Sequence, residues 1–163
     1  MIESPRPDSV LLIRDAALRV TRQRVAVLDA VGANPHTSAA AVLARVSVVL
    51  PGVSHQAVYD CLSDLTNAGL LRRILVVEGG AAMYETRTRD NHHHCVCRAC
   101  GLVVDVDCAV GAAPCLEASD ASGFVIDEAE VTYRGFCAAC AEPNDVPVRP
   151  SPPSNSIRET QNG

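Results

Sequence analysis

The chain has 163 residues, of which 48% are hydrophobic, and this size suits one ordinary domain or two small ones. Its formal net charge of −5 gives no indication of a nucleic-acid partner, but the charge is unevenly spread. Residues 1–89 carry 10 Arg against 8 acidic residues, whereas residues 90–163 carry 4 Arg against 11. Only the first, mildly basic half therefore suits contact with phosphate.

No window of the chain has the apolar length of a membrane span, so we expect no membrane partner. The segment MIESPRPDSV has acids and prolines where a signal peptide needs a basic region and an apolar run. We therefore expect a cytoplasmic protein, in which thiols stay reduced. Eight cysteines in that compartment indicate metal binding or redox chemistry before structural disulfides.

Helices followed by a hairpin are predicted in the first half of the chain. The expected helices cover residues 11–20, 21–31, 33–50 and 54–70. Segments LLRRILVV and AAMYETR then flank the turn EGG, which predicts a hairpin. The last three helices and the hairpin follow the order of a winged helix-turn-helix.

Residues suited to helix ends support these ranges. Thr21, Thr37 and Ser54 are expected N-caps, because their side-chain oxygens can accept a hydrogen bond from a backbone N–H of the first turn. Gly69 is expected just beyond the end of the last helix, where a left-handed backbone is common.

The second half differs in composition and in the length of its predicted elements. Short, cysteine-rich segments follow residue 90, with a short helix expected at GAAPCLEAS (111–119) and a half-buried strand at VIDEAEVTYRGFC (125–137). From residue 142 the composition turns to Pro, Ser and Asn, which predicts a disordered tail. The expected divisions are therefore residues 1–89, 90–141 and 142–163.

Two CxxC pairs have the spacing of metal ligands. Cys97 and Cys100 form the first pair, and Cys137 and Cys140 form the second. Each pair can close a tight turn around one ion, and together they complete a tetrahedral Cys₄ zinc site. A redox CxxC is the alternative, but such motifs usually occur singly, at a helix start after a strand.

The histidines of NHHHC belong to a different site. In an extended segment, successive side chains alternate faces, so His92 and His94 share one face while His93 and Cys95 share the other. Two imidazoles on the same face form half of a site for Fe²⁺, Zn²⁺ or Mn²⁺.

The remaining ligands of that site must come from elsewhere in the chain. Glu85 and Asp105 offer oxygen donors close in sequence. His36 precedes a helix in the other half, and taken alone it reads as an ordinary exposed histidine. The residues therefore predict two sites, one of thiolates and one of histidines and carboxylates.

These motifs resemble the ferric uptake regulator (Fur) family of bacterial metal-dependent repressors. The matching segments are LRVTRQRVAVLDAV, PHTSAAAVL, VSHQAVYDCLSDLTNAGLLRRI, MYETR, NHHHCVCRACG and CAAC, in the family's order. DVDCAVGAAPCLEASD further resembles an actinobacterial subgroup encoded beside catalase-peroxidase genes.

The resemblance implies an α+β protein with an N-terminal winged helix-turn-helix and a small α/β dimerisation domain that holds a Cys₄ zinc site. It places structural Zn²⁺ on Cys97, Cys100, Cys137 and Cys140. It places a regulatory metal, Fe²⁺ or another divalent ion, between the domains on His36, Glu85, His92, His94 and Asp105.

The chain also departs from the family pattern. A further metal site of many members is expected to be absent, because Asn91, Ala112 and Ala129 leave only His93 of its ligands. Peroxide-sensing members usually have Asp where this chain has Glu85, which favours metal sensing, whereas the subgroup resemblance favours redox control.

Contacts with double-stranded operator DNA are expected from the helix-turn-helix. Arg22 and Arg24 lie in the first turn of a helix, where cations oppose the helix dipole, so a phosphate neighbour would offset that cost. A simply solvated pair explains them equally well. At the end of the recognition helix that enters the major groove, the expected contacts are Ser54, His55, Gln56 and Tyr59.

Together these observations predict a homodimeric, metal-responsive transcriptional repressor that releases DNA when the metal is lost or its ligands are oxidised. Two enzymes remain as alternatives: a zinc hydrolase, which lacks a recognisable general base here, and a thiol oxidoreductase, which would bind no zinc. Iron, peroxide and zinc sensing all stay open. Cys61 is expected in the core, while Cys95, Cys108 and Cys115 are open to a redox-responsive role that the sequence alone does not assign.

Overall fold

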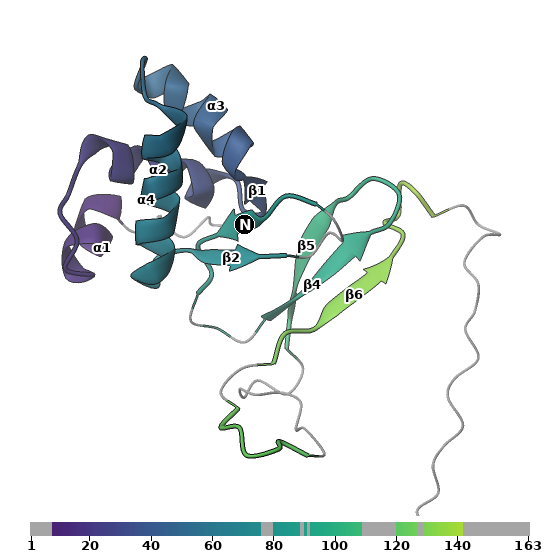
Figure 1. Cartoon of the computed structure of the whole chain (residues 1–163). Helices are drawn as coiled ribbons and strands as arrows, with labels where there is room; N and C mark the ends of the chain where they lie inside the picture. Colours follow the sequence, from purple (N-terminus) through teal and green to yellow (C-terminus); the bar gives the residue numbers. More distant parts are fainter. Residues whose placement is uncertain are drawn as a thin grey trace, which may run out of the picture.

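The computed structural model describes residues 8–75, 80–88, 90, 92–108, 120–126 and 129–141. Figure 1 shows a helical N-terminal part joined to a C-terminal part built on a sheet, which confirms the predicted α+β class. The helix expected at 111–119, Cys115 and the tail from residue 142 lie outside the described residues. No helix in the described ranges has both the length and the apolar character needed to cross a bilayer.

Four helices form the N-terminal part. Their bounds are Ser9–Asp15 (α1), Arg22–Ala33 (α2), Ala39–Val49 (α3) and His55–Asn67 (α4). They pack around an aliphatic core, as the scarcity of aromatic residues requires. Its fully buried members are Ile13, Val27, Val31, Val42, Val46, Val58, Leu62, Leu65 and Leu71. Cys61 also belongs to this core, as predicted.

Two of the three expected N-caps are confirmed. The side chain of Thr21 accepts from the Arg24 N–H, and that of Ser54 accepts from the Ala57 N–H. The expectation for Thr37 was wrong, because Ser38 caps α3. Thr37 lies in a short strand, so its backbone is held in a sheet and the helix begins later.

That strand, Thr37–Ser38 (β1), belongs to a sheet of order β1-β3-β2. Strands Arg72–Ile74 (β2) and Met83–Glu85 (β3) are antiparallel, which confirms the predicted hairpin. β1 pairs antiparallel with β3, with Thr37 opposite Tyr84. The next positions outward are His36 and Glu85, so this pairing brings a residue before α3 beside the end of the hairpin.

The second sheet has the order β5-β4-β6. Its strands are His92–Cys97 (β4), Val103–Asp107 (β5) and Thr132–Gly135 (β6), with β5 antiparallel and β6 parallel to the central β4. The strand predicted over 125–137 was too long. Among the described residues of that range, strand pairing covers only the four residues of β6, an edge strand on which Tyr133 is 50% exposed.

The second sheet has a small core that reaches into the hairpin. Val96 and Val103 pack with Ile74 of β2, and Met83 of β3 covers them in part. The predicted domain boundary after residue 89 is therefore crossed by an apolar cluster, and the division stays a prediction.

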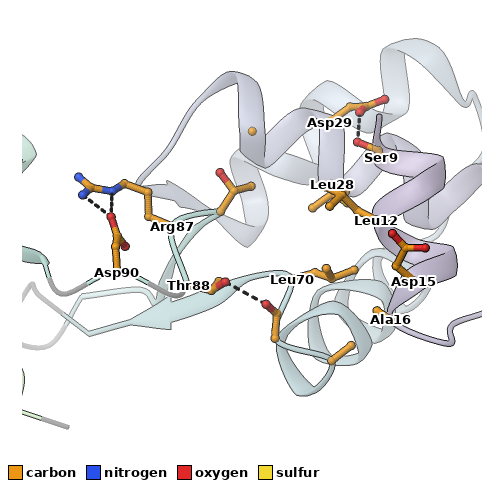
Figure 2. A pocket seen from close by; sticks show the side chains of 14 residues that line it. Ser9, Leu12, Asp15, Ala16, Leu28, Asp29, Leu70, Arg87, Thr88 and Asp90 are labelled. Carbon is orange, nitrogen blue, oxygen red and sulfur yellow. Dashed lines mark hydrogen bonds and ion pairs between the residues drawn. The ribbon is translucent and has the colours of Figure 1, made fainter. Parts of the chain in front are cut away.

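Thr88, shortly after β3, contacts the helical part. Thr88 Oγ1 donates to the Gly69 carbonyl oxygen at 2.9 Å, just beyond α4, where Gly69 has the expected positive φ of 69°. Figure 2 shows this contact beside a cavity of about 720 Å³, which Leu12 and Leu28 also line. This contact therefore ties the segment that follows β3 to the end of α4.

Candidate metal centres and nucleic-acid interface

Four cysteines converge at one end of the second sheet. The Sγ atoms of Cys97, Cys100, Cys137 and Cys140 all lie within 4.8 Å of one another. The parallel pairing of β4 with β6 places Cys97 opposite Gly135, so both CxxC turns leave the sheet at the same end. The predicted spacing thus becomes a single cluster.

The electrostatics of this cluster suit a cation. Backbone N–H groups of Cys100 and Cys137 lower the pKa of Cys97 to about 6, and the Cys137 N–H donates to Cys97 Sγ at 3.3 Å. Hydrogen bonds with the thiols of Cys137 and Cys100 raise the pKa of Cys140 to about 12. Four crowded thiols therefore cannot all ionise alone, whereas a divalent ion allows it.

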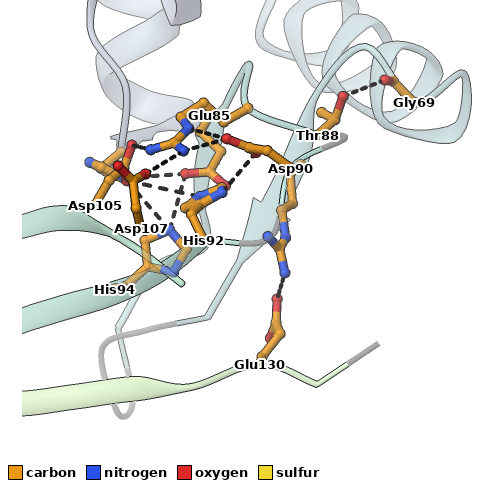
Figure 3. A network of polar contacts seen from close by, with 12 residues as sticks. Gly69, Glu85, Thr88, Asp90, His92, His94, Asp105, Asp107 and Glu130 are labelled. Atoms are coloured by element: carbon orange, nitrogen blue, oxygen red, sulfur yellow. Dashed lines mark hydrogen bonds and ion pairs between the residues drawn. The ribbon is translucent and has the colours of Figure 1, made fainter. Parts of the chain in front are cut away.

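A second cluster lies between the two parts of the molecule (Figure 3). Ligand atoms of His36, Glu85, His94 and Asp105 all lie within 4.8 Å of one another. His36 precedes β1, Glu85 ends β3, and His94 lies opposite Asp105 in the pairing of β4 with β5. Four separate segments thus meet at one point.

His92 lies beside this cluster. Its Nε2 atom is 3.1 Å from Glu85 Oε1 and 3.9 Å from Asp105 Oδ1. The predicted strand faces are confirmed, because His92 and His94 both contact Glu85. The ring of His93 instead lies on the other side of β4, with its centroid 6.3 Å from that of Tyr133.

The distances fit a common ion better than a set of hydrogen bonds. Glu85 Oε2 is 3.1 Å from Nε2 of both His36 and His94. His36 Nε2 lies 2.7 Å from Asp105 Oδ1, yet both atoms are buried and do not meet hydrogen-bond geometry. Ligands about 2.1 Å from a metal are about 3 Å apart when adjacent, so these atoms are placed as ligands would be. The nitrogen and oxygen donors suit Fe²⁺, Mn²⁺ or Zn²⁺.

Glu85 is 1% exposed, so its charge needs compensation. Burial alone would raise the pKa of Glu85, but the neighbouring imidazoles of His36 and His94 lower it to about 2. The close contact with Glu85 in turn raises the pKa of His36. His36 also has a left-handed backbone with φ of 55°, which is uncommon outside glycine.

Sequence reasoning did not single out two polar residues beside this cluster. Arg87 contacts Asp105, and Asp90 contacts His92. Arg87 is the last residue of the segment MYETR and Asp90 directly precedes NHHHCVCRACG, but neither type nor spacing marked either residue. His36, which alone resembled an exposed histidine, has a side chain only 10% exposed.

The expected DNA-contacting end of α4 is open to solvent. His55, Gln56 and Tyr59 are exposed, and Ser54 caps the helix. Gln56 Nε2 donates to Asp60 Oδ1 at 2.7 Å, so the amide is held one turn along the same face. These positions leave the four predicted contacts accessible.

The two arginines of α2 differ from each other. Arg22 is exposed. The guanidinium of Arg24 donates to Asp64 and, at 2.7 Å, to the Arg19 carbonyl oxygen, so it ties α2 to α4. At the start of the hairpin, Arg72 Nη2 donates to Glu130 Oε1 at 2.7 Å. Arg22 is therefore the better placed of the α2 pair to meet phosphate.

Comparisons with known proteins agree with these features. Residues 15–134 match the profile of the ferric uptake regulator family. Transcriptional regulator FurA of Mycobacterium tuberculosis is 57% identical over 135 residues, which cover 83% of this chain and 91% of that protein. Ferric uptake regulation protein 1 of Mycolicibacterium fortuitum is 60% identical over 122 residues, 75% of each chain.

A solved structure shares the fold. The ferric uptake regulator of Francisella tularensis, determined with iron, aligns with a TM-score of 0.63 and 21% identity, over 77% of this chain and 96% of that one. Identity this low supports the fold alone.

Proposed function

Because this chain belongs to the ferric uptake regulator family of transcriptional regulators, we propose that it represses transcription as a homodimer that binds operator DNA when a divalent metal fills the His/carboxylate cluster. One observation carries the proposal. His36 comes from the helical part, whereas His94 and Asp105 come from the second sheet, and their ligand atoms lie within 4.8 Å of one another. A metal held there joins the two parts.

A metal that links the two parts explains how binding of a small ion would change the affinity for DNA. Two recognition helices must lie about 34 Å apart to enter successive major grooves. A dimer achieves that spacing only at certain angles between its helical parts and its dimerisation parts. An ion bound by His36 and His94 together favours one such angle, so metal and DNA binding share a coupling free energy of about 1–3 kcal/mol.

We assign different ions to the two clusters. The four thiolates of Cys97, Cys100, Cys137 and Cys140 suit structural Zn²⁺. The regulatory set of His36, Glu85, His92, His94 and Asp105 suits Fe²⁺, which the names of the mycobacterial relatives also favour. Zn²⁺ and Mn²⁺ accept the same donors, so the experiment below separates them.

The DNA contacts are assigned to the exposed end of α4, with phosphate contacts from α2. Ser54, His55, Gln56 and Tyr59 face solvent there, and Arg22 lies near the start of α2. The mildly basic charge of residues 1–89 supports this placement, since the acidic second half would repel DNA. A repressor of this kind works in the cytoplasm, where its operator is.

Operator binding by the full-length, zinc-loaded protein tests the proposal. A duplex is first selected from a randomised pool with Mn²⁺ present, and its affinity is then measured by fluorescence anisotropy with Fe²⁺, Mn²⁺, Zn²⁺ or a chelator, before and after peroxide. One metal should tighten binding by about 5–150-fold. His94→Ala should lose that gain while retaining its four-cysteine zinc.

Equal affinity with every metal and with the chelator would contradict the proposal. Loss of binding after peroxide, with recovery on fresh Fe²⁺, would indicate release of the metal. Loss without recovery would indicate oxidised ligands, the redox-responsive form of the same function.

A further inference from the structure

One arginine contacts three carboxylates beside the His/carboxylate cluster. Arg87 Nε donates to Asp90 Oδ2 at 2.6 Å, Nη1 donates to Asp105 Oδ2 at 3.0 Å, and Nη2 donates to Asp107 Oδ1 at 2.9 Å. Figure 3 shows these three acids gathered around the histidines. Asp105 belongs to the cluster and Asp90 contacts His92 beside it, whereas the side chain of Asp107 is 89% exposed.

The contact with Asp105 decides which oxygen can face a metal. Arg87 holds Oδ2, while Oδ1 lies 2.7 Å from His36 Nε2 and 3.8 Å from His94 Nε2. The guanidinium on Oδ2 holds the carboxylate so that Oδ1 is the oxygen presented to the two imidazoles. This orientation favours Asp105 as a single-oxygen ligand.

The contact with Asp90 orients a second ligand. Asp90 Oδ2 binds Arg87, and its Oδ1 lies 3.0 Å from His92 Nδ1. A carboxylate at Nδ1 holds the proton there and leaves the Nε2 lone pair for a metal. His92 Nε2 indeed points to Glu85, at 3.1 Å.

We propose that Arg87, acting with Asp90, is a positioning residue of the regulatory metal site that fixes His92 and orients Asp105 as a single-oxygen ligand. This inference rests on the proposed function of that site. Arg87 touches no metal itself. Asp107 lies opposite His92 in the strand pairing, but its side chain is 89% exposed and contacts Arg87, so we assign it no role in placing the ligands.

Charge and position give opposite expectations for removal of Arg87. A cation close to a divalent metal repels it, so on charge alone a neutral residue at position 87 would tighten metal binding. If Arg87 positions ligands, the same change frees Asp105 and Asp90 and weakens binding. The sign of the effect therefore separates the two explanations.

The test uses the full-length zinc-loaded protein, stripped of regulatory metal and titrated with Co²⁺ alone. Affinity is measured against a competing chelator, and the visible bands of Co²⁺ report its coordination. Arg87→Met should weaken Co²⁺ binding by about 10–100-fold, as loss of a ligand-orienting residue typically does, and should change the bands. Arg87→Lys keeps the positive charge but lacks the planar guanidinium that can bind several carboxylates at once. Its Co²⁺ affinity should therefore lie between those of Arg87→Met and wild type.

Asp90 and Asp107 form a matched pair, because both side chains bind Arg87 and that of Asp90 also contacts the His92 ring. Asp90→Ala should weaken Co²⁺ binding, whereas Asp107→Ala should stay near wild type. Melting curves of the stripped proteins show whether each variant is folded. If Arg87→Met does not fold, the comparison of Asp90→Ala with Asp107→Ala still decides the question.

Unchanged or tighter Co²⁺ binding by Arg87→Met would overturn the proposal, and so would equal losses in Asp90→Ala and Asp107→Ala. Failure of the proposed function looks different. In that case the Co²⁺ bands of wild type and of His94→Ala would be the same, because the ion would not bind at this site. The inference about Arg87 would then fail as well.

Discussion

The two ligand clusters of this protein are built in opposite ways. The cysteine cluster draws its ligands from two turns at one end of a single sheet, so it is closed within one part of the molecule. The His/carboxylate cluster draws its ligands from four segments on both sides of the connection between β3 and β4. A closed cluster can stabilise the part that holds it, whereas a cluster shared between parts can report on how they are arranged.

The cores of the two parts support this contrast. The helical part has its own buried aliphatic cluster, and Ile13, Val42 and Leu62 are among its fully buried members. The described residues of the second sheet contribute only Val96 and Val103, with Ile74 borrowed from the hairpin. A core of that size rarely suffices alone, so we expect the second part to depend on a metal at the cysteine cluster for its folding.

The largest effect is therefore expected from the cysteine cluster. Cys97→Ser should release the tightly bound zinc and unfold the second sheet, because structural zinc contributes about 10–16 kcal/mol to folding in small domains. Cys97 is 5% exposed and also accepts the Cys137 N–H, so its loss removes a ligand and a hydrogen bond together. Elemental analysis measures the zinc, and sedimentation measures the dimer.

Cys95→Ser provides the matched control. Cys95 lies two positions earlier on β4, is half-buried and does not belong to the cluster. It should keep its zinc and remain a dimer. A Cys97→Ser protein that is free of zinc, yet folded and dimeric, would show that the cysteine cluster does not stabilise the second part.

A smaller and more selective effect is expected from the shared cluster. His36→Ala should keep zinc and the dimer but lose the metal-dependent gain in operator binding, about 5–150-fold. The reason is that His36 is the ligand contributed from the N-terminal end of β1. Metal titration followed by fluorescence anisotropy measures the gain.

His93→Ala is the control for His36→Ala. His93 is also buried, but its ring lies against Tyr133 on the opposite face of β4. The variant should be less stable than wild type and should still respond to metal. If His93→Ala abolished the response and His36→Ala did not, the assigned faces of β4 would be exchanged, as a register slip of one residue would do.

The sequence predicted the closed cluster better than the shared one, and the reason is physical. CxxC spacing is a local property, and so is the alternation of faces that separates His92 from His93. The position of His36 depends on β1, a strand of two residues that has no pattern of its own and exists because β3 pairs with it. The same pairing displaced the expected N-cap from Thr37 to Ser38.

The contacts of Arg87 were beyond sequence reasoning for a related reason. Asp105 lies 18 positions further along the chain, on another strand, and is brought close by the pairing of β4 with β5. Arg24 is a similar case, since Asp64 is 40 positions away. Long-range ion pairs leave no periodic pattern in the sequence. The sequence therefore cannot distinguish an exposed arginine from one held by a distant carboxylate.

The smallest predicted effect separates Arg22 from Arg24 and tests whether DNA contact and metal response are independent. Arg22 is exposed, so Arg22→Ala should lower the slope of log affinity against log salt by about one unit. Arg24 is tied to Asp64, with their side chains 19% and 44% exposed, so Arg24→Ala should leave that slope nearly unchanged. It should instead destabilise the helical part by about 0.2–1 kcal/mol, which a double-mutant cycle with Asp64→Ala measures.

Since neither residue touches the shared cluster, Arg22→Ala should weaken DNA binding by the same factor with and without metal. A full-unit loss of slope in Arg24→Ala would mean that this arginine leaves Asp64 for a phosphate in the complex. A changed metal gain in Arg22→Ala would mean that the metal acts through α2 itself and not through the angle between the two parts.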